Sequence, residues 1–326
     1  MGGFTFCCGD MGPMMDAKGT VTREILDIIE ENPKVCYINS DGTGKGNLTA
    51  KMLEKYPDRV LDVGIAEMNM VTIAAGLALK GYIPFAQTFG PFLCVRALDQ
   101  IHNDVAYNNL PVRLIGTHAG ISSGYGPTHN TIIELGIMNA LPNMTMIAPC
   151  DGNQCKKVIR KSLEYPHPIY IRIPRGEEPS VYEEGYEYDY VIGKAIEIKE
   201  GKDLTIIATG MGVFNSVQAA RQLEEKGYDI GVIDMHTIKP IDKDAIIRAA
   251  KRTGAILTVE DHNIQGGMGS IVADVLMQAG VSAKFRKIGI PDCFVEYGYP
   301  EELYPYYGMD AAGITKTALE MLENRA

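Results

Sequence analysis

The stretch from residue 60 to residue 89 reads VLDVGIAEMNMVTIAAGLALKGYIPFAQTF. Its two ends are short apolar runs typical of buried strands, and Met68 to Lys80 has the small, apolar composition of a buried helix. A strand, a helix and a strand in this order form the repeating unit of a parallel sheet. This stretch therefore predicts an α/β fold.

The same alternation continues on both sides of this stretch. Further strands are expected at 35–39, 112–116, 144–148 and 169–173, and a second set of strands and helices begins at 204–208. Between the two sets, residues 177–192 are acidic and aromatic without periodicity, which predicts a linker on the surface. We therefore predict two doubly wound sheet domains, at 19–176 and 193–326, after an N-terminal arm at 1–18.

The composition excludes several classes of protein. The chain has 31 basic and 41 acidic residues and a formal charge of −10, so a nucleic-acid-binding surface is not expected. An anionic ligand must then be held by a few local arginines, lysines and helix N-termini. The start of the chain lacks the pattern of a secretory signal, and the seven cysteines are irregularly spaced. We expect a cytoplasmic protein with reduced thiols and no membrane contact.

Glu67 lies at the expected first turn of the helix in the opening stretch. A carboxylate there is usually explained by the helix dipole, which favours negative charge at a helix N-terminus. Its neighbours in the sequence, Ile65, Met68 and Met70, are apolar, however, so the carboxyl group can also be buried. A carboxyl group shielded from water can exchange a proton with a ligand. The residues alone leave both explanations open.

Five motifs in order resemble the pyrimidine-binding and C-terminal domains of transketolase. They are GIAEMNMVTIAAGLALKGYIPFAQTF, GPTHN, IRIPRG, DMHTIKPID and VEDHNIQGGMGS, and the resemblance covers the chain from about Gly19 onward. It implies that Glu67 hydrogen-bonds the aminopyrimidine ring of thiamine diphosphate and so activates the cofactor. It also implies that Phe89 stacks on this ring and that Phe92 lines the same pocket. Val95 stands where transketolases commonly have a tyrosine.

The resemblance also implies residues for the substrate. His129 would hydrogen-bond the donor oxygen near the reacting carbon, and His118 would reach toward the phosphate end of the sugar. Arg23 and Arg175 match the arginines that hold the terminal phosphate, an anion that a guanidinium fork fits well. For Arg23, a solvent-exposed helix residue is an equally good explanation.

Two departures from the family pattern leave the choice of substrate open. Tyr125 replaces an acidic residue just before the GPTH motif, in a loop one residue shorter, so a phenol stands where a carboxylate reads a substrate hydroxyl. Lys45 or Gly46 stands in the region of a serine that helps to hold the phosphate. A lysine there can hold either a phosphate or a sulfonate.

One motif of the family is missing from the chain. Thiamine-diphosphate enzymes bind the diphosphate through Mg²⁺ (or Ca²⁺), using a Gly-Asp-Gly motif and a later asparagine, and this sequence has no Gly-Asp-Gly. We therefore expect a separate N-terminal subunit that holds the diphosphate and the metal ion, with two copies of each chain in an α2β2 assembly. No metal ligand is expected in this chain.

These observations predict one subunit of a split transketolase, which transfers a two-carbon ketol unit from an anionic ketose to an aldose. Two enzymatic alternatives share the same plan, namely the β subunit of a 2-oxoacid dehydrogenase and a deoxyxylulose-phosphate synthase-like subunit. The Arg175 motif and the GPTH loop favour a sugar phosphate over the former. A non-enzymatic alternative is a catalytically silent regulatory partner, which the presence of Glu67 disfavours.

Overall fold

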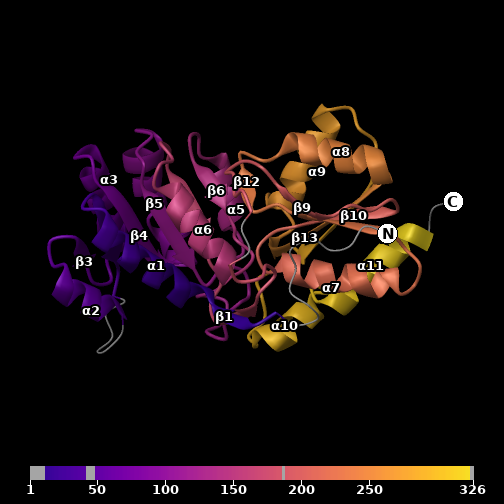
Figure 1. Cartoon of the computed structure of the whole chain (residues 1–326), viewed down its shortest axis with the longest axis horizontal. Coiled ribbons are helices and arrows are strands. Elements are labelled where there is room, and N and C mark those ends of the chain that lie inside the picture. The colour runs from indigo at the N-terminus through magenta and orange to yellow at the C-terminus, as the bar shows by residue number, and fades with distance from the viewer. Residues whose placement is uncertain (1–11, 42–47, 186–187, 324–326) are drawn as a thin grey trace.

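A computed structural model of the chain describes residues 12–41, 48–185 and 188–323. Each half of the chain forms an α/β domain on its own sheet, and the two domains lie side by side (Figure 1). The prediction of two doubly wound domains is confirmed. No helix within the described ranges is both long enough and apolar enough to span a bilayer.

The first domain contains a seven-stranded sheet of order β12-β6-β7-β5-β4-β2-β3. The strands from the first half of the chain run parallel, which follows from the helices that connect them. Edge strand β12 comes from the second half and is antiparallel to β6. The bounds are β2 (Val35–Asn39), β3 (Val60–Asp62), β4 (Ile83–Phe89), β5 (Arg113–Thr117), β6 (Thr145–Ile147), β7 (Ile169–Arg172) and β12 (Thr237–Lys239).

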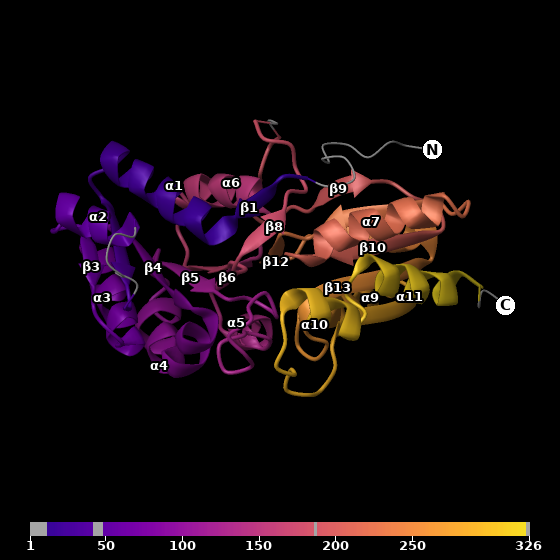
Figure 2. The same ribbon diagram turned by 90° about the horizontal axis from the view of Figure 1, so that it is seen from below.

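Helices cover both faces of this sheet (Figure 2). One face packs against α1 (Ala17–Glu31), α2 (Leu48–Lys55) and α6 (Gly152–Ser162). The other packs against α3 (Glu67–Leu79), η1 (Phe92–Arg96), η2 (Ile101–Ala106) and α5 (Glu134–Ala140), with the short α4 (Leu98–Gln100) between η1 and η2. The helical spacing of Ile25, Ile28 and Ile29 places all three in the core, which explains why α1 docks with this face.

The π-helical turns η1 and η2 are absent from the sequence-based prediction. Hydrophobic periodicity does not reveal them because a π-helical turn shifts the register of a helix by one residue. Such turns are rare and occur frequently at functional sites. Here η1 follows β4 directly after Gly90 and Pro91, and it carries Phe92 and Arg96.

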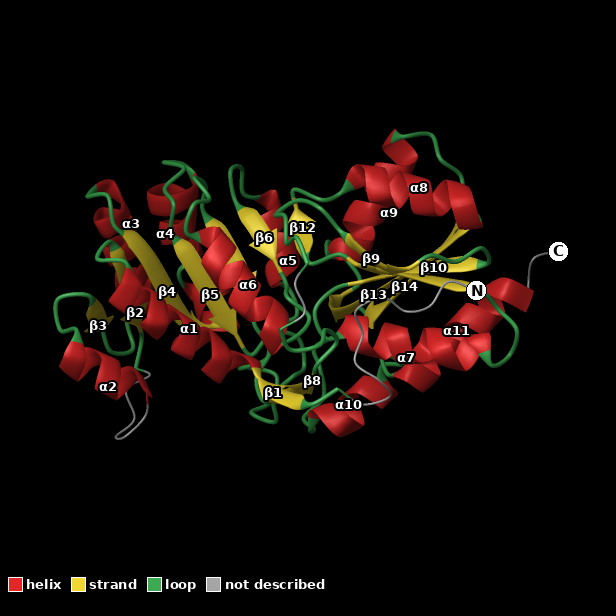
Figure 3. Ribbon diagram, in the orientation of Figure 1, coloured by secondary structure: helices red, strands yellow, loops and turns green. Residues whose placement is uncertain are grey.

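The second domain has a five-stranded sheet of order β14-β13-β10-β11-β9, in which only β9 is antiparallel (Figure 3). Helices α8 and α9 lie on one face and α7 and α11 on the other. The bounds are β9 (Ile196–Lys199), β10 (Leu204–Ala208), α7 (Gly212–Glu224), β11 (Ile230–Asp234), α8 (Lys243–Thr253), β13 (Ala255–Asn263), α9 (Met268–Gln278), β14 (Lys284–Ile290), α10 (Pro300–Tyr306) and α11 (Ala311–Glu323).

The arm and the linker differ from their predicted descriptions. Strand β1 (Met14–Asp16) pairs with β8 (Glu177–Pro179) in an antiparallel ribbon, so the end of the arm is part of the fold. The prediction of a surface linker is wrong for Val181, Tyr182 and Tyr190, which are buried. The physical reason is Asp151, whose buried carboxylate accepts the backbone N–H groups of both Val181 and Tyr182 at 2.8 Å. Residues 1–11 and 186–187 lie outside the described part.

A buried ionic cluster joins the two domains. Arg172 at the end of β7 forms ion pairs with Glu134 and, at 2.5 Å, with Asp261 of the second domain. His262, beside Asp261, accepts the backbone N–H of Leu135 at 3.1 Å. Because paired charges buried in this way are costly to separate, they fix the orientation of the second domain against the carboxyl ends of the first sheet.

Candidate functional site

The carboxyl ends of β2, β4 and β5 open into a cleft of about 590 Å³. This edge of a parallel sheet is where ligands bind in doubly wound folds. Asn39 and Gln87, which line the cleft, are buried and each has a side-chain atom without a hydrogen-bond partner among the described residues. Unsatisfied buried amides are uncommon in folded proteins, and they indicate that this cleft takes a polar ligand.

Glu67 is the first residue of α3, and only 2% of its surface is exposed. Its carboxylate has two contacts of different strength. Arg96 Nη1 donates to Oε2 at 2.9 Å, and Ser40 Oγ donates to Oε1 at a long 3.4 Å. Ser40 Oγ also lies 3.0 Å from Thr88 Oγ1, and both of these residues line the cleft. Hydroxyl groups therefore connect the cleft to the buried carboxylate.

An aromatic wall, made of Phe92, Phe89, His118 and Tyr125, runs beside the cleft. The ring centroids of successive members are 5.6, 3.9 and 5.6 Å apart. His129 packs edge-on against the two phenylalanines, with centroid distances of 5.7 and 5.3 Å. The structure thus brings together five residues from two segments of the chain, 89–92 and 118–129.

Gly90 explains how β4 can turn into this wall. A Cβ at this position would collide with the hydroxyl of Thr131 and would lie 3.1 Å from the carbonyl oxygen of Thr117. Only glycine allows the end of β4 to approach the neighbouring loop so closely. The chain then turns between Phe89 and Phe92, and the two rings stack on each other.

His118 is fully buried within the wall and has a left-handed backbone, with φ of 63°. A non-glycine residue in this conformation is uncommon and often marks a functional site. Burial, together with the charges of Lys18 and Arg175, lowers the pKa of His118 to about 3, so the ring is neutral at physiological pH. Thr117 Oγ1 donates to the Thr88 carbonyl at 3.3 Å and lies 2.9 Å from His118 Nδ1. This arrangement places the imidazole proton on Nδ1 and leaves Nε2, which has no partner among the described residues, as an acceptor.

Positive charge gathers at the other end of the cleft. Lys18, Arg23 and Arg175 all line it, together with the carboxylates of Asp16, Asp41 and Glu177. Partial burial and the charge of Arg175 lower the pKa of Lys18 below its usual value. Three cations in one cleft of a chain with a charge of −10 are the local concentration that an anionic ligand requires.

Tyr125 holds Arg175 in place. The guanidinium Nη2 donates to the Tyr125 hydroxyl at 2.7 Å, and the guanidinium carbon lies 4.2 Å from the centre of the ring. Arg96 stacks in the same way on Phe92 at the opposite end of the wall, at 4.6 Å. The wall is therefore bracketed by two arginines. Lys45 lies outside the described residues, so its predicted contact with the anion remains a prediction.

Reasoning from the sequence missed several residues of the site. Ser40 and Thr88 follow or end strands, so their position at the carboxyl edge was a usable signal. Lys18 and Arg96 carried no such signal, because each belongs to an element whose position is set by tertiary packing. The structure brings Glu67, Phe89, Phe92, His118, Tyr125, His129, Arg23 and Arg175 to one edge, while their chemical roles stay predictions.

Glu178 is a further residue that the sequence did not single out. It lies on β8, only 4% of its surface is exposed, and its Oε2 has no partner among the described residues. Burial, with the charges of Asp16, Asp261 and Glu177, raises the pKa of Glu178 to about 9. It lines a second pocket, of about 400 Å³, together with Tyr125 and Arg175. A carboxyl group that keeps its proton at neutral pH thus lines the same pocket as the arginine.

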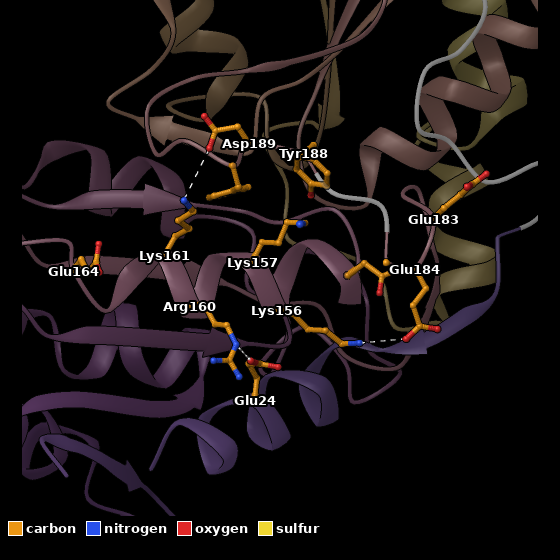
Figure 4. A pocket seen from close by; sticks show the side chains of 13 residues that line it. Glu24, Lys156, Lys157, Arg160, Lys161, Glu164, Glu183, Glu184, Tyr188 and Asp189 are labelled. Carbon is orange, nitrogen blue, oxygen red and sulfur yellow. Dashed lines mark ion pairs between the residues drawn. The ribbon is translucent and has the colours of Figure 1, made fainter. Parts of the chain in front are cut away.

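A larger hollow, of about 980 Å³, lies between α6 and residues 183–185 and 188–190 (Figure 4). It is lined by many charged side chains, but its cations have partners. Lys156 pairs with Glu184 at 3.5 Å, Lys161 with Asp189 at 3.9 Å, and Arg160 with Glu24 at 2.5 Å. Since these exposed pairs neutralise one another and the hollow is remote from the sheet edge, we place the site in the smaller cleft.

The residues at the Glu67 end fit an aminopyrimidine. The flat guanidinium of Arg96 already lies over Phe92 and donates to the Glu67 carboxylate. A flat ring with nitrogen atoms therefore has a carboxylate to bond and an aromatic side chain to lie against at this place. The described residues do not fit a metal ion, because no three His, Cys, Asp or Glu side chains among them lie close enough to share one.

Two family models match the chain and together cover most of it. The transketolase pyrimidine-binding domain matches residues 14–180, and the transketolase C-terminal domain matches residues 193–314. The chain belongs to the transketolase family. The boundary between the two matches falls in the segment that joins the two sheets.

Similar proteins include whole subunits and halves of longer chains. The chain is 36% identical to one subunit of the apulose-4-phosphate transketolase of Phocaeicola vulgatus, over 95% of this chain and 98% of the relative. It is 38% identical to a 1-deoxy-D-xylulose-5-phosphate synthase of Geobacter sulfurreducens, over 89% of this chain but 45% of the relative. A solved structure of a split gene transketolase, described as an inactive β4 tetramer, has a TM-score of 0.87 at 34% identity and covers 96% of this chain and 100% of that one.

Proposed function

We propose that this transketolase-family chain is the pyrimidine-binding and C-terminal subunit of a split, thiamine-diphosphate-dependent transketolase. In the proposed reaction a two-carbon ketol unit moves from an anionic ketose to an aldose. The observation that carries the proposal is the buried Glu67 carboxylate, which lies at one end of an aromatic wall whose other end holds Arg175 beside a cation-lined cleft. A transferase of this kind needs both an activating acid and an anion site.

The candidate site residues have distinct parts in this proposal. The bound cofactor would supply the carbanion chemistry. Glu67 would hold a proton shared with the pyrimidine N1′ atom, Phe89 would stack against the ring, and Phe92 would line the same pocket and help to exclude water. His129 would hydrogen-bond the donor oxygen near the reacting carbon, and the acceptor Nε2 of neutral His118 suits a substrate hydroxyl. Arg23, Arg175 and Lys18 would hold the phosphate or sulfonate.

Exposed apolar side chains on α3 and on the segments next to it support the need for a separate partner. Helix α3 is apolar on all sides, as is typical of a buried helix. Yet Ile65 just before it is 74% exposed and Leu79 at its end 70%, while Val95 of η1 and Tyr107 after η2 are 52% and 80% exposed. We propose that the N-terminal subunit, which holds the diphosphate and Mg²⁺ (or Ca²⁺), covers this surface in an α2β2 assembly.

The proposal is tested by reconstitution. The chain is co-expressed with a candidate N-terminal subunit that carries Gly-Asp-Gly and its downstream asparagine, and ketol transfer is assayed with phosphorylated and sulfonated ketoses. We expect Glu67→Gln to reduce turnover by about 100-fold or more, the usual contribution of a positioned acid or base. Glu225→Gln, at an exposed position remote from the cleft, is the matched control. Full turnover of Glu67→Gln, or failure of the chains to assemble, would refute the proposal.

The similarity to 1-deoxy-D-xylulose-5-phosphate synthase favours that activity as the second candidate. The substrate distinguishes the two, since the synthase, as its name states, makes 1-deoxy-D-xylulose-5-phosphate. The same reconstituted enzyme is therefore assayed with pyruvate and a triose phosphate. Product from pyruvate and none from ketose donors would favour the second candidate, and lipoyl-dependent decarboxylation would favour a 2-oxoacid dehydrogenase. Assembly without any turnover would favour a silent partner.

A further inference from the structure

We propose that, in the chain without cofactor, the Arg96 side chain occupies the place of the aminopyrimidine, and that it must move away when the ring binds. This inference rests on the proposed function. It concerns a residue outside the set that the family resemblance implies. Three properties carry it, namely the geometry of the guanidinium, the electrostatic need of Glu67 and the freedom of the Arg96 side chain.

The guanidinium of Arg96 bonds the carboxylate that the proposed ring would bond, and it lies against Phe92, which lines the pocket predicted for the ring. It donates from Nη1 to Glu67 Oε2 at 2.9 Å, and its central carbon lies 4.6 Å from the centre of the Phe92 ring. A guanidinium is flat, delocalised and rich in N–H donors, so it resembles a protonated aminopyrimidine in shape and in hydrogen bonding. The guanidinium and the ring cannot both occupy the space beside Phe92 and bond the same oxygen of Glu67.

The Glu67 carboxylate needs a partner when no cofactor is bound. A buried carboxylate without a hydrogen-bonding cation is strongly disfavoured. Ser40, whose hydroxyl also donates to Glu67, lies at 3.4 Å, which is a weak contact. Arg96 therefore satisfies Glu67 in the chain alone, and this same ion pair opposes binding of the ring.

Arg96 is also able to leave. About 45% of its side chain is exposed, whereas only 3% of the Glu67 side chain is, so the two partners differ in freedom. The residue lies at the last position of η1, next to exposed Val95. A long arginine stem can carry its charge away from Glu67 while Glu67 stays fixed. Binding of the ring thus exchanges one partner of Glu67 for another.

The test compares Arg96→Gln and Arg96→Lys with the matched control Arg286→Gln. Arg286 is similarly exposed, at 44% of its side chain, and pairs with Glu320 at 2.7 Å far from the site. Binding of thiamine diphosphate with Mg²⁺ to the reconstituted complex is measured by calorimetry, because the chain has no tryptophan to report on binding. We expect the dissociation constant to fall by about fivefold to tenfold in Arg96→Gln, less in Arg96→Lys and not in Arg286→Gln.

The thermal midpoint of the chain alone provides an independent readout. Arg96→Gln should lower it more than Arg286→Gln does, because it leaves a buried carboxylate unpaired, and Arg96→Lys should recover part of the loss. Unchanged or weaker cofactor binding in Arg96→Gln would overturn the inference, since Arg96 would then be a bystander or a permanent ligand of Glu67. If the wild-type complex itself binds no cofactor, the proposed function fails instead, so the two failures are distinguishable.

Discussion

Replacement of Glu178 by glutamine should stabilise the chain, and the gain should grow as the pH rises. Glu178 is buried, and its pKa is raised from the usual 4.5 to about 9 by burial and by three nearby carboxylates. The folded chain therefore keeps a proton on Glu178 that the unfolded chain releases above pH 4.5. Glutamine has the same shape and is neutral at every pH, so it removes this dependence without opening a cavity.

The sign and size of the effect follow from proton linkage. Between the unfolded and the folded pKa of Glu178 the native state binds more protons, so the stability that this group contributes is complete below pH 4.5 and is lost toward pH 9. One proton corresponds to about 1.4 kcal/mol per pH unit. From about pH 5.5 to about pH 8.5, the difference in unfolding free energy between variant and wild type should grow by at most about 4 kcal/mol.

Urea denaturation of both proteins at several pH values measures this difference. Other titrating groups, such as neutral His118, are shared by the two proteins and cancel in the comparison. Glu225→Gln is the matched control, because Glu225 is exposed in the second domain and is not among the carboxylates that raise the pKa of Glu178, so it should leave the pH profile unchanged. Parallel profiles for Glu178→Gln and wild type would refute the reasoning, because they would show that Glu178 is ionised in the folded chain.

Three further predictions concern the wall, the segment between the sheets and the partner surface. Tyr125→Phe removes the 2.7 Å hydrogen bond to Arg175 but keeps the stacking of the guanidinium on the ring. In initial-rate assays, KM for an anionic ketose should therefore rise about fivefold at unchanged kcat. An unchanged KM would show that this hydrogen bond does not help Arg175 to bind the anion. Asp151→Ala leaves three buried backbone N–H groups without their acceptor. The free energy of unfolding, measured by urea denaturation, should therefore fall by about 3 kcal/mol. A fall of less than about 1 kcal/mol would show that water replaces the carboxylate. Met68, next to Glu67 on α3, is also exposed, and Met68→Glu places a charge on the proposed partner surface. Co-purification with the N-terminal subunit should then be lost, while the thermal midpoint of the chain alone stays the same. Retained co-purification would place the interface elsewhere.

Local patterns made much of the fold predictable. The predicted strands at 35–39 and 204–208 agree with β2 and β10 to the residue. These elements are regular and well separated by turn residues, so their hydrophobic pattern is sufficient. The η1 and η2 turns and the β1–β8 ribbon were not predicted, because the former break the helical period and the latter pairs residues that are distant in the chain.

The sequence by itself determined the α/β alternation, the position of Glu67 at the start of a helix and the lack of a Gly-Asp-Gly motif. Each of these is a property of neighbouring residues and needs no knowledge of folding. Only the tertiary structure decided that Arg96 lies against Glu67, that Tyr125 holds Arg175 and that Glu178 is buried. These contacts join side chains from different elements of the fold, and their energies depend on burial and distance, which arise only when the chain has folded.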